Sequence, residues 1–317
     1  MSDVKAIEEL GVKYKQLRTE IAKVIVGQDE TVNHVLYSIF AGGHSLLVGV
    51  PGLAKTLLVH TIAQAIGLDF KRIQFTPDLM PSDILGSEIL DENRKFKFIK
   101  GPIFSNIILA DEINRTPPKT QAALLEAMQE RSVTIAGHCH TLDAPFFVLA
   151  TQNPIEQEGT YPLPEAQLDR FMFSIYLDYP SFDEEVEVVK STTSDKKVQV
   201  NPLFTADEIV KCQHLIRRIP VADNVIEYAV NLVSKTRPNT KNATKLVNEY
   251  IQWGAGPRAS QNLILAAKVN AAIKGKFSPD IEDVKSVVFP ILNHRIVKNY
   301  KAEAEGISER EIINSLL

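Results

Sequence analysis

The sequence is poor in cysteine and in long apolar runs, and each scarcity excludes a class of protein. Its two cysteines, Cys139 and Cys212, are too few for a disulfide framework and fit a reducing compartment. Its longest apolar stretches, such as 107–110 and 145–150, are far shorter than the roughly 18 residues of a membrane helix. The first ten residues carry acids where a secretory signal would be basic and apolar. We therefore expect a cytoplasmic protein without a membrane span.

Excess charge of either sign is also absent. With 35 basic and 39 acidic residues the net charge is -4, so the chain has no global basic footprint for nucleic acid. The hydrophobic fraction is 44% and the charged fraction is 23%, which is the profile of a globular protein and not of a disordered one. At 317 residues we expect about two domains.

The first half of the chain alternates short apolar runs with helical periodicity, which is typical of a parallel sheet with helices on both faces. The expected strands are 44–48, 71–75, 106–110, 146–151 and 173–177. A helix over 55–66 follows the first strand and ends at Gly67, a favourable C-terminal cap. A second helix should be capped by Thr116, carry Pro117 in its first turn and end near Arg131.

Beyond Pro180 the pattern changes, because the stretch after it is polar and only helical periodicity follows. Helices are predicted over 205–218, 223–236, 257–274 and 281–297. We therefore expect an α/β core over residues 1–182, followed by a smaller all-α lid domain over residues 183–317.

The strongest local motif is Gly49-Val-Pro-Gly-Leu-Ala-Lys-Thr56, which lies between a predicted strand and a predicted helix, the context of a phosphate-binding loop. Backbone amides of such a loop surround a phosphate, while Lys55 can reach the terminal phosphates and the Thr56 hydroxyl can ligate magnesium. Ala54 stands where the pattern usually has its second glycine. A Gly-Pro turn before an amphipathic helix is the simpler alternative. The residues expected to surround ATP or ADP are Gly49, Pro51, Gly52, Leu53, Ala54, Lys55, Thr56 and Leu57.

Polar side chains end two later strands. The apolar run 107–110 leads into Asp111, which can hold magnesium, and Glu112, which can polarise the water that attacks the γ-phosphate. The strand over 146–151 is followed by Asn153, whose amide could orient that water or sense the γ-phosphate. The alternative for Asn153 is that an Asn-Pro pair merely starts a turn.

At this point the chain resembles the MoxR family of AAA+ ATPases, and the resemblance covers essentially its whole length. The family's Walker A motif is similar to residues 49–56, in which Ala54 is usual for the family, and its Walker B motif to Leu109-Ala-Asp-Glu-Ile-Asn-Arg115. The other matching segments are 124–131, 150–156, 163–171 and Gly254-Ala-Gly-Pro-Arg258.

The resemblance implies a P-loop AAA+ core and magnesium-dependent ATP hydrolysis in a ring of identical copies, typically a hexamer. By this resemblance Asn153 is sensor 1, Arg170 is the arginine finger that enters the site of the next copy, and Arg258 is sensor 2. Arg131 and Arg115 remain alternatives for the finger, and an intrachain salt bridge remains the alternative for Arg170.

The resemblance also assigns segments outside these motifs. Val26 and Gly27 lie in the stretch whose backbone holds adenine, and residues 86–104 and 132–142 resemble the family's two hairpin inserts. It further implies that hydrolysis drives chaperone-like remodelling or maturation of a client protein complex. A protein with a von Willebrand type A domain is one expected client.

Two other functions stay open. Basic and aromatic residues alternate over 94–100, as on surfaces that bind single-stranded nucleic acid, which would suit a nucleic-acid motor. We prefer an ordinary exposed hairpin, and hence no nucleic-acid partner, because the chain has no other basic groove. A nucleotide-gated assembly module without turnover is the second alternative, and the presence of Glu112 and Asn153 argues against it.

Overall fold

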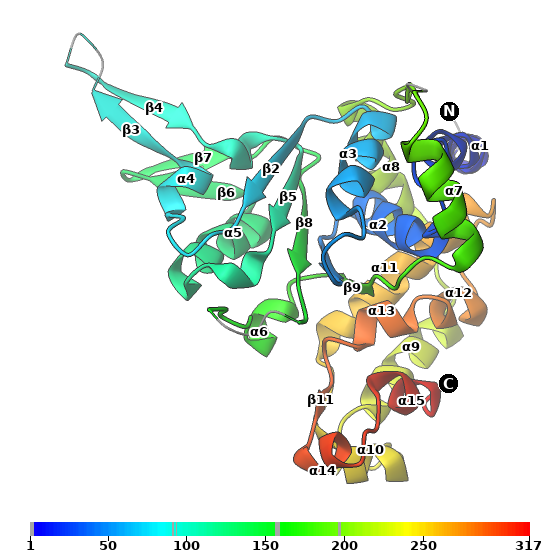
Figure 1. The fold of residues 1–317 in the computed structure, drawn as a ribbon. Helices are drawn as coiled ribbons and strands as arrows, with labels where there is room; N and C mark the ends of the chain where they lie inside the picture. The colour runs from blue at the N-terminus through cyan, green and yellow to red at the C-terminus, as the bar shows by residue number, and fades with distance from the viewer. Residues whose placement is uncertain (1–2, 91, 93, 156–158, 196–197) are drawn as a thin grey trace.

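The computed structural model describes residues 3–90, 92, 94–155, 159–195 and 198–317. Its centre is a five-stranded parallel sheet with the strand order β2-β5-β8-β1-β9 (Figure 1). The strands are β1 (Ser45–Val48), β2 (Phe70–Gln74), β5 (Ile107–Asp111), β8 (Phe147–Gln152) and β9 (Phe173–Tyr176). Each end lies within one residue of the predicted end, so the predicted parallel sheet is confirmed.

Helices cover both faces of the sheet, because alternate strand residues point to two separate apolar clusters. In β5, for example, Leu109 belongs to one cluster and Ile108 to the other. The first face is covered by α1 (Asp3–Ala22), α2 (Asp29–Ala41) and α3 (Lys55–Ile66). The second face is covered by α4 (Pro81–Leu85) and α5 (Pro118–Glu130).

The two helices predicted in the core are both present, but one start is wrong. Helix α3 has the predicted bounds and ends at Gly67, whose φ of 78° is a left-handed cap. Helix α5 begins at Pro118, and Thr116 does not cap it, since its hydroxyl donates to the Ile113 carbonyl at 3.3 Å. The reason is that a residue before proline avoids the helical region, so Pro117 stays extended and the helix starts at Pro118.

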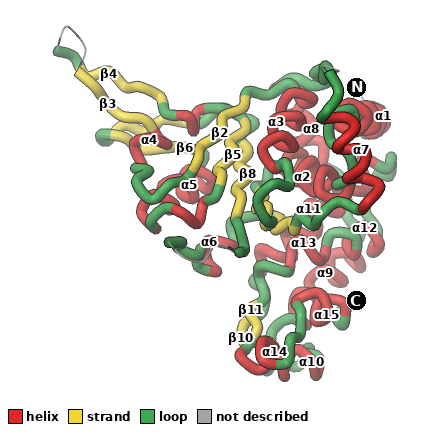
Figure 2. The backbone as a smooth tube through the Cα atoms, viewed as in Figure 1, coloured by secondary structure: helices red, strands yellow, loops and turns green. Residues whose placement is uncertain are grey.

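The C-terminal part is helical, as Figure 2 shows in red, apart from a two-stranded antiparallel ribbon of β10 (Ile251–Trp253) and β11 (Val297–Lys298). Strands this short leave no periodicity for sequence analysis to detect. No helix in the described ranges is long and apolar enough to cross a membrane. The helices are α7 (Phe182–Thr192), α8 (Ala206–Arg218), α9 (Asp223–Lys235), α10 (Lys245–Tyr250), α11 (Pro257–Ile273), α12 (Ile281–Lys285), α13 (Val288–Leu292), α14 (Tyr300–Ala304) and α15 (Glu309–Asn314).

The single helix predicted over 281–297 is wrong. The chain forms α12, then α13, and then enters β11. The break has a simple cause, because Pro290 has no N–H for the carbonyl four residues earlier and is tolerated only in the first turn of a helix. A new helix that begins at Val288 places Pro290 in that first turn.

Two antiparallel hairpins project from the second face of the sheet (Figure 1). They pair β3 (Gly86–Leu90) with β4 (Phe96–Lys100), and β6 (Ser132–Ile135) with β7 (His138–Thr141), inside the two stretches where hairpins are predicted. The hairpins touch through Phe98, which stacks on His140 with ring centroids 4.2 Å apart. The tip of the first hairpin leaves Leu90 and Phe96 exposed.

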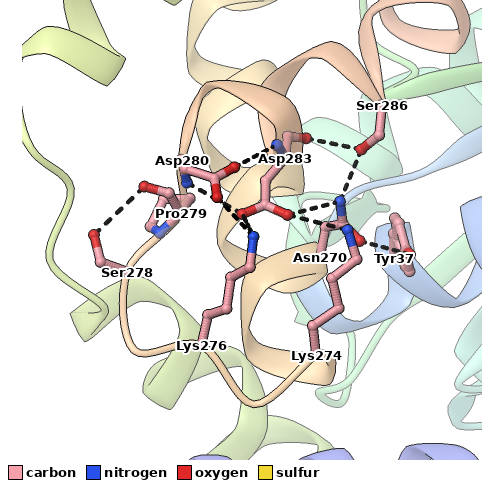
Figure 3. A network of polar contacts seen from close by, with 9 residues as sticks. All are labelled: Tyr37, Asn270, Lys274, Lys276, Ser278, Pro279, Asp280, Asp283 and Ser286. Atoms are coloured by element: carbon pink, nitrogen blue, oxygen red, sulfur yellow. Dashed lines mark hydrogen bonds and ion pairs between the residues drawn. The ribbon is translucent and has the colours of Figure 1, made fainter.

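Core and lid share one apolar cluster, which runs from α1, α2 and α3 into α8, α9 and α11. A buried polar network lies in the same junction (Figure 3). The Tyr37 hydroxyl of α2 donates to the side-chain oxygen of Asn270 in α11 at 3.0 Å, and Asn270 donates to Ser286 at 2.7 Å. The fully buried Asp283 accepts from Lys274 and Lys276 at 3.1 and 3.0 Å, so its charge is paired. The boundary at residue 182 remains a prediction.

Removing the Tyr37 hydroxyl tests this junction. We expect Tyr37→Phe to lower the free energy of unfolding by about 1–3 kcal/mol, because Asn270 would keep a buried acceptor without its donor. Urea denaturation measures the change. The matched control is Tyr300→Phe, which alters an 85% exposed tyrosine and should cost less than about 0.5 kcal/mol. Equal losses in both variants would contradict the role of the bond.

Candidate functional site

The predicted phosphate loop connects the end of β1 to the start of α3, at the carboxyl edge of the sheet. Two of its residues have left-handed backbones, Gly52 with φ 89° and Ala54 with φ 52°. Gly49 is required for another reason, since a Cβ built on it would lie 2.9 Å from the Cβ of Leu177. Leu53 is buried in the apolar cluster and anchors the loop. The exposed part of the loop, which includes Pro51, is therefore held in place by the close packing at Gly49 and by the buried Leu53.

Lys55 opens α3 and points back over the loop, where its ammonium group donates to the Gly49 carbonyl. Burial lowers the pKa of Lys55, and the carboxylates of Asp111 and Glu112 oppose that shift. Thr56 and Leu57 follow in the same helical turn and are exposed. Loop backbone, ammonium and hydroxyl thus meet at a helix N-terminus, which is where a phosphate is favoured.

Asp111 is the last residue of β5 and is the more constrained of the two acids. Its carboxylate accepts from the Thr151 hydroxyl at 2.6 Å, and from Arg72 Nη2 and Nε at 2.6 and 2.9 Å. Thr151 lies in β8 and Arg72 in β2, which flank β5 in the sheet. The carboxylate is therefore fixed in place by its two neighbouring strands.

Glu112 leaves the strand through a left-handed backbone with φ 58°. Its N–H donates to the Thr151 hydroxyl at 2.8 Å, while its carboxylate accepts from Gln74 Nε2 at 2.8 Å and Arg115 Nη1 at 3.0 Å. Sequence analysis missed Gln74, Thr151 and Arg72. Gln74 and Thr151 lie at or near the carboxyl ends of predicted strands, which marked them as candidates, whereas Arg72 lies in the middle of β2 and carried no such signal.

Asn153 directly follows β8, between the phosphate loop on β1 and the acids on β5. It is 4% exposed, and its side-chain oxygen accepts from the Ile155 N–H at 3.1 Å. The turn proposed as the alternative for Asn153 therefore exists, and Asn153 also lies between the phosphate loop and the two acids. Glu156, which ends the matching sequence segment, lies outside the described residues.

The segment predicted to hold adenine lies under the start of α7. Gly27 has a φ of 65°, and a Cβ built on it would lie 2.4 Å from a carboxylate oxygen of Glu184. Val26 is half-buried beside it. The next residue, Gln28, has a buried side-chain oxygen that has no hydrogen-bond partner within the described part of the chain. An unmatched acceptor thus lies next to the glycine.

Arg170 and Arg258 lie at the other edge of the sheet. Arg170 precedes β9 and donates to the Leu125 carbonyl at 2.8 Å. Arg258, at the start of α11, donates to the Asp169 carboxylate at 2.9 Å, and the buried Arg295 donates to the same carboxylate at 2.7 Å. Arg170 makes no ion pair within the described ranges, so the salt bridge proposed as its alternative is wrong; the ion pairs of this stretch join Asp169 to Arg258 and Arg295.

The strand register separates these arginines from the phosphate loop. In the parallel pair of β1 and β9, Ser45 lies opposite Phe173 and Val48 opposite Tyr176. The loop follows Val48 and Arg170 precedes Phe173, so a strand length of about 13 Å lies between them. Within one chain, Arg170 and Arg258 therefore lie apart from the residues around the phosphate loop, which are Lys55, Asp111, Glu112 and Asn153.

The two other finger candidates fall on different edges. Arg115 is bound to Glu112 of its own chain, at the carboxyl edge. Arg131 ends α5 with a left-handed φ of 51° and donates to the Gly42 carbonyl at 3.2 Å, just before β1 and thus at the amino edge. Geometry therefore places Arg131 with Arg170 and separates both from Arg115.

Known proteins resemble this chain along most of its length. Residues 44–173 match the ATPase family associated with various cellular activities (AAA), and residues 243–316 match the AAA lid domain. Chaperone MoxR1 of Mycobacterium tuberculosis is 43% identical over 94% of this chain and 79% of its own length. Protein MoxR of Methylorubrum extorquens is 30% identical over 87% of this chain and 85% of its own.

A solved structure has the same fold. A protein from Cytophaga hutchinsonii that was proposed to be an ATPase superposes with a TM-score of 0.92, at 46% identity over 100% of this chain and 98% of that one. The arrangement of a parallel sheet followed by a helical lid is therefore shared by a structure of closely similar sequence.

The left-handed Ala54 provides a test of the loop. We expect Ala54→Gly to raise the free energy of unfolding by about 0.5–1 kcal/mol, because glycine adopts this conformation without the clash of a Cβ. The control is the same substitution in the middle of the same helix, Ala63→Gly, which should lower stability by about 1 kcal/mol or more. Urea denaturation compares them, and a loss in both variants would count against the assigned strain.

Proposed function

This chain belongs to the MoxR family of AAA+ ATPases, and from that premise we propose that it is a magnesium-dependent ATP hydrolase that works as a ring of identical copies. The observation that carries the proposal is the meeting of Lys55, Asp111, Glu112 and Asn153 around the phosphate loop, at one edge of the sheet. These are the groups that ATP hydrolysis requires, and they come from three adjacent strands and the helix after one of them.

Each group has a role that its position supports. Lys55 and the loop amides would bind the β- and γ-phosphates, and Glu112 would take a proton from the attacking water as general base. Asn153 would hold that water or the γ-phosphate by its amide. Glu112 accepts the hydrogen bonds from Gln74 and Arg115 on one oxygen, Oε2, and a carboxylate has further acceptor positions that could take a proton from water.

The residues present fit a magnesium ion. Magnesium prefers oxygen ligands, and the Thr56 hydroxyl and the Asp111 carboxylate supply them beside the loop. Bound magnesium would neutralise phosphate charge. The chain's part is to hold Asp111 in place, through the hydrogen bonds from Thr151 and Arg72.

An adenine nucleotide is supported by the segment under α7. The close packing of Glu184 against Gly27 leaves no room for a side chain at this position. The unmatched oxygen of Gln28 could accept a hydrogen bond from an amino group such as that of adenine. We propose that Val26 and Gly27 hold the base of ATP or ADP.

Two substitutions separate nucleotide binding from turnover. We expect Lys55→Ala to lose ATP binding, because the phosphates lose their cation. Glu112→Gln should keep ATP binding but lower turnover by a factor of about 100 or more, because only the base is removed. Binding is measured with a fluorescent ATP analogue and turnover by phosphate release. Turnover in Glu112→Gln at the normal rate would show that another group is the base.

Chelation provides the corresponding test for the metal. Wild-type turnover should fall to background in excess EDTA and return when magnesium is added back. A rate that is unaffected by EDTA would refute the magnesium dependence.

The positions of the arginines support the proposed ring. A cation near the γ-phosphate stabilises the charge of the transition state, yet Arg170 lies about a strand length from the loop of its own chain, and Arg258 is bound to the adjacent Asp169. We infer that both reach the nucleotide of the next copy. Such contacts join different surfaces of identical copies head to tail, and they close into rings. Six copies are expected by analogy with the family.

Substitution of the finger tests the shared site. We expect the wild-type ATPase rate per chain to rise with protein concentration, and Arg170→Ala to lower it by a factor of about 1,000 while ATP binding persists. Arg131→Ala is the matched control, since Arg131 lies at the same edge and should change the rate far less. If Arg131→Ala abolished turnover and Arg170→Ala did not, Arg131 would be the finger.

The client is proposed from relatives and from surface chemistry. The similar protein of Mycobacterium tuberculosis is named a chaperone. We propose that this chain likewise remodels or matures a partner complex, with a von Willebrand type A domain protein as one candidate. The exposed Leu90 and Phe96 on the projecting hairpin are suitable for gripping a client. Two free cysteines support our proposal of a cytoplasmic location.

A further inference from the structure

Trp253 is the only tryptophan of the chain, and its side chain is 72% exposed. It ends β10, where it pairs with Val297 of β11. Tryptophan brings a larger apolar area than any other residue and is enriched at the centres of protein interfaces. Its exposure on a helical lid with a well-filled core therefore requires an explanation.

The turn that carries Trp253 is rigid. Gly254 is packed so closely that a Cβ built on it would lie 2.4 Å from the Thr236 carbonyl oxygen. The Ala255 N–H donates to the Thr236 hydroxyl at 3.0 Å, and the Ala255 carbonyl accepts from Arg237 Nε at 3.0 Å. The indole is thus presented on a fixed support, which reduces the entropy lost when a partner binds it.

The indole of Trp253 lies between two hollows in the surface. Two hollows share Trp253 as a wall, with volumes of about 560 and 400 Å³. Asp169 and Arg295 line the larger hollow, while Arg237 and Pro257 line the smaller. A projecting aromatic ring beside two hollows can interdigitate with a complementary surface, as residues at interface cores do.

This surface is continuous with the edge that carries the proposed trans-acting arginines. Asp169, in the wall of the larger hollow, accepts the hydrogen bond of Arg258 and immediately precedes Arg170. If Arg170 and Arg258 enter the site of the next copy, the surface around Asp169, which adjoins Arg170 in sequence and binds Arg258, lies at that contact and is covered by that copy too. A client or a small molecule placed there would compete with that contact.

We propose that Trp253 anchors the contact between neighbouring copies of this chain, by packing against the nucleotide-binding side of the next copy. The proposal rests on the proposed ring and adds to it a residue that has no part in the chemistry. Trp253 would supply apolar contact area, whereas Arg170 and Arg258 would supply charge.

The fluorescence of Trp253 tests this directly, because no other tryptophan contributes to the signal. Glu112→Gln with magnesium and ATP is titrated from nanomolar to micromolar concentration, while sedimentation reports the assembly. We expect the emission to shift to shorter wavelength over the range in which copies assemble. Assembly without any shift would overturn the role of Trp253 and leave the ring intact. If no assembly occurred at any concentration, the ring and the anchor would both be refuted.

Substitution provides the second readout. We expect Trp253→Ala to raise the concentration for half-assembly at least tenfold, without changing ATP binding by isolated copies. Phe277→Ala is the matched control. Phe277 is also exposed, but it lies beyond the other end of α11, a 17-residue helix about 25 Å long, so its loss should leave assembly unchanged. Equal effects of the two variants would refute the anchor.

Discussion

The parallel direction of the central strands is the constraint on which the rest of this molecule depends. All carboxyl ends meet at one edge, so the phosphate loop, Asp111, Glu112 and Asn153 gather there from strands far apart in sequence. The same direction places the segment before β9, with Arg170, at the opposite edge. A single chain therefore holds both the proposed nucleotide site and the cations proposed to complete one, at opposite edges of the sheet.

The charged side chains at the proposed nucleotide edge interact with one another within the chain. Arg72 is paired with Asp111 and Arg115 with Glu112, while Lys55 lies over the loop near both acids. Because these pairs are only partly buried, solvent weakens each of them. A bound triphosphate would add negative charge beside this network. It would attract the Lys55 ammonium group toward the phosphates, and it would repel the carboxylates of Asp111 and Glu112 from their present positions. If the proposed nucleotide binds there, the positions of these charged side chains should therefore change.

Sequence analysis succeeded where one residue type or one period determines the outcome. Apolar runs set the five strands, the Gly67 cap ended α3, and the loop motif located Lys55. It failed where prolines change the bounds of a helix. Two consecutive prolines moved the start of α5 past Thr116, and Pro290 divided the last predicted helix. The position of Gln74 at a strand end could have been noticed, but its pairing with Glu112 across the sheet could not be predicted, because it depends on strand order.

The apolar cluster that runs unbroken from α1 to the lid has a mechanical consequence. Parts that share one close-packed core unfold together and bend little, because sliding them apart would open voids at a high cost. The Tyr37–Asn270 bond reinforces this junction from within. Each copy of the proposed ring should therefore move as a rigid body. Motion driven by the nucleotide would then take place at the contacts between neighbouring copies.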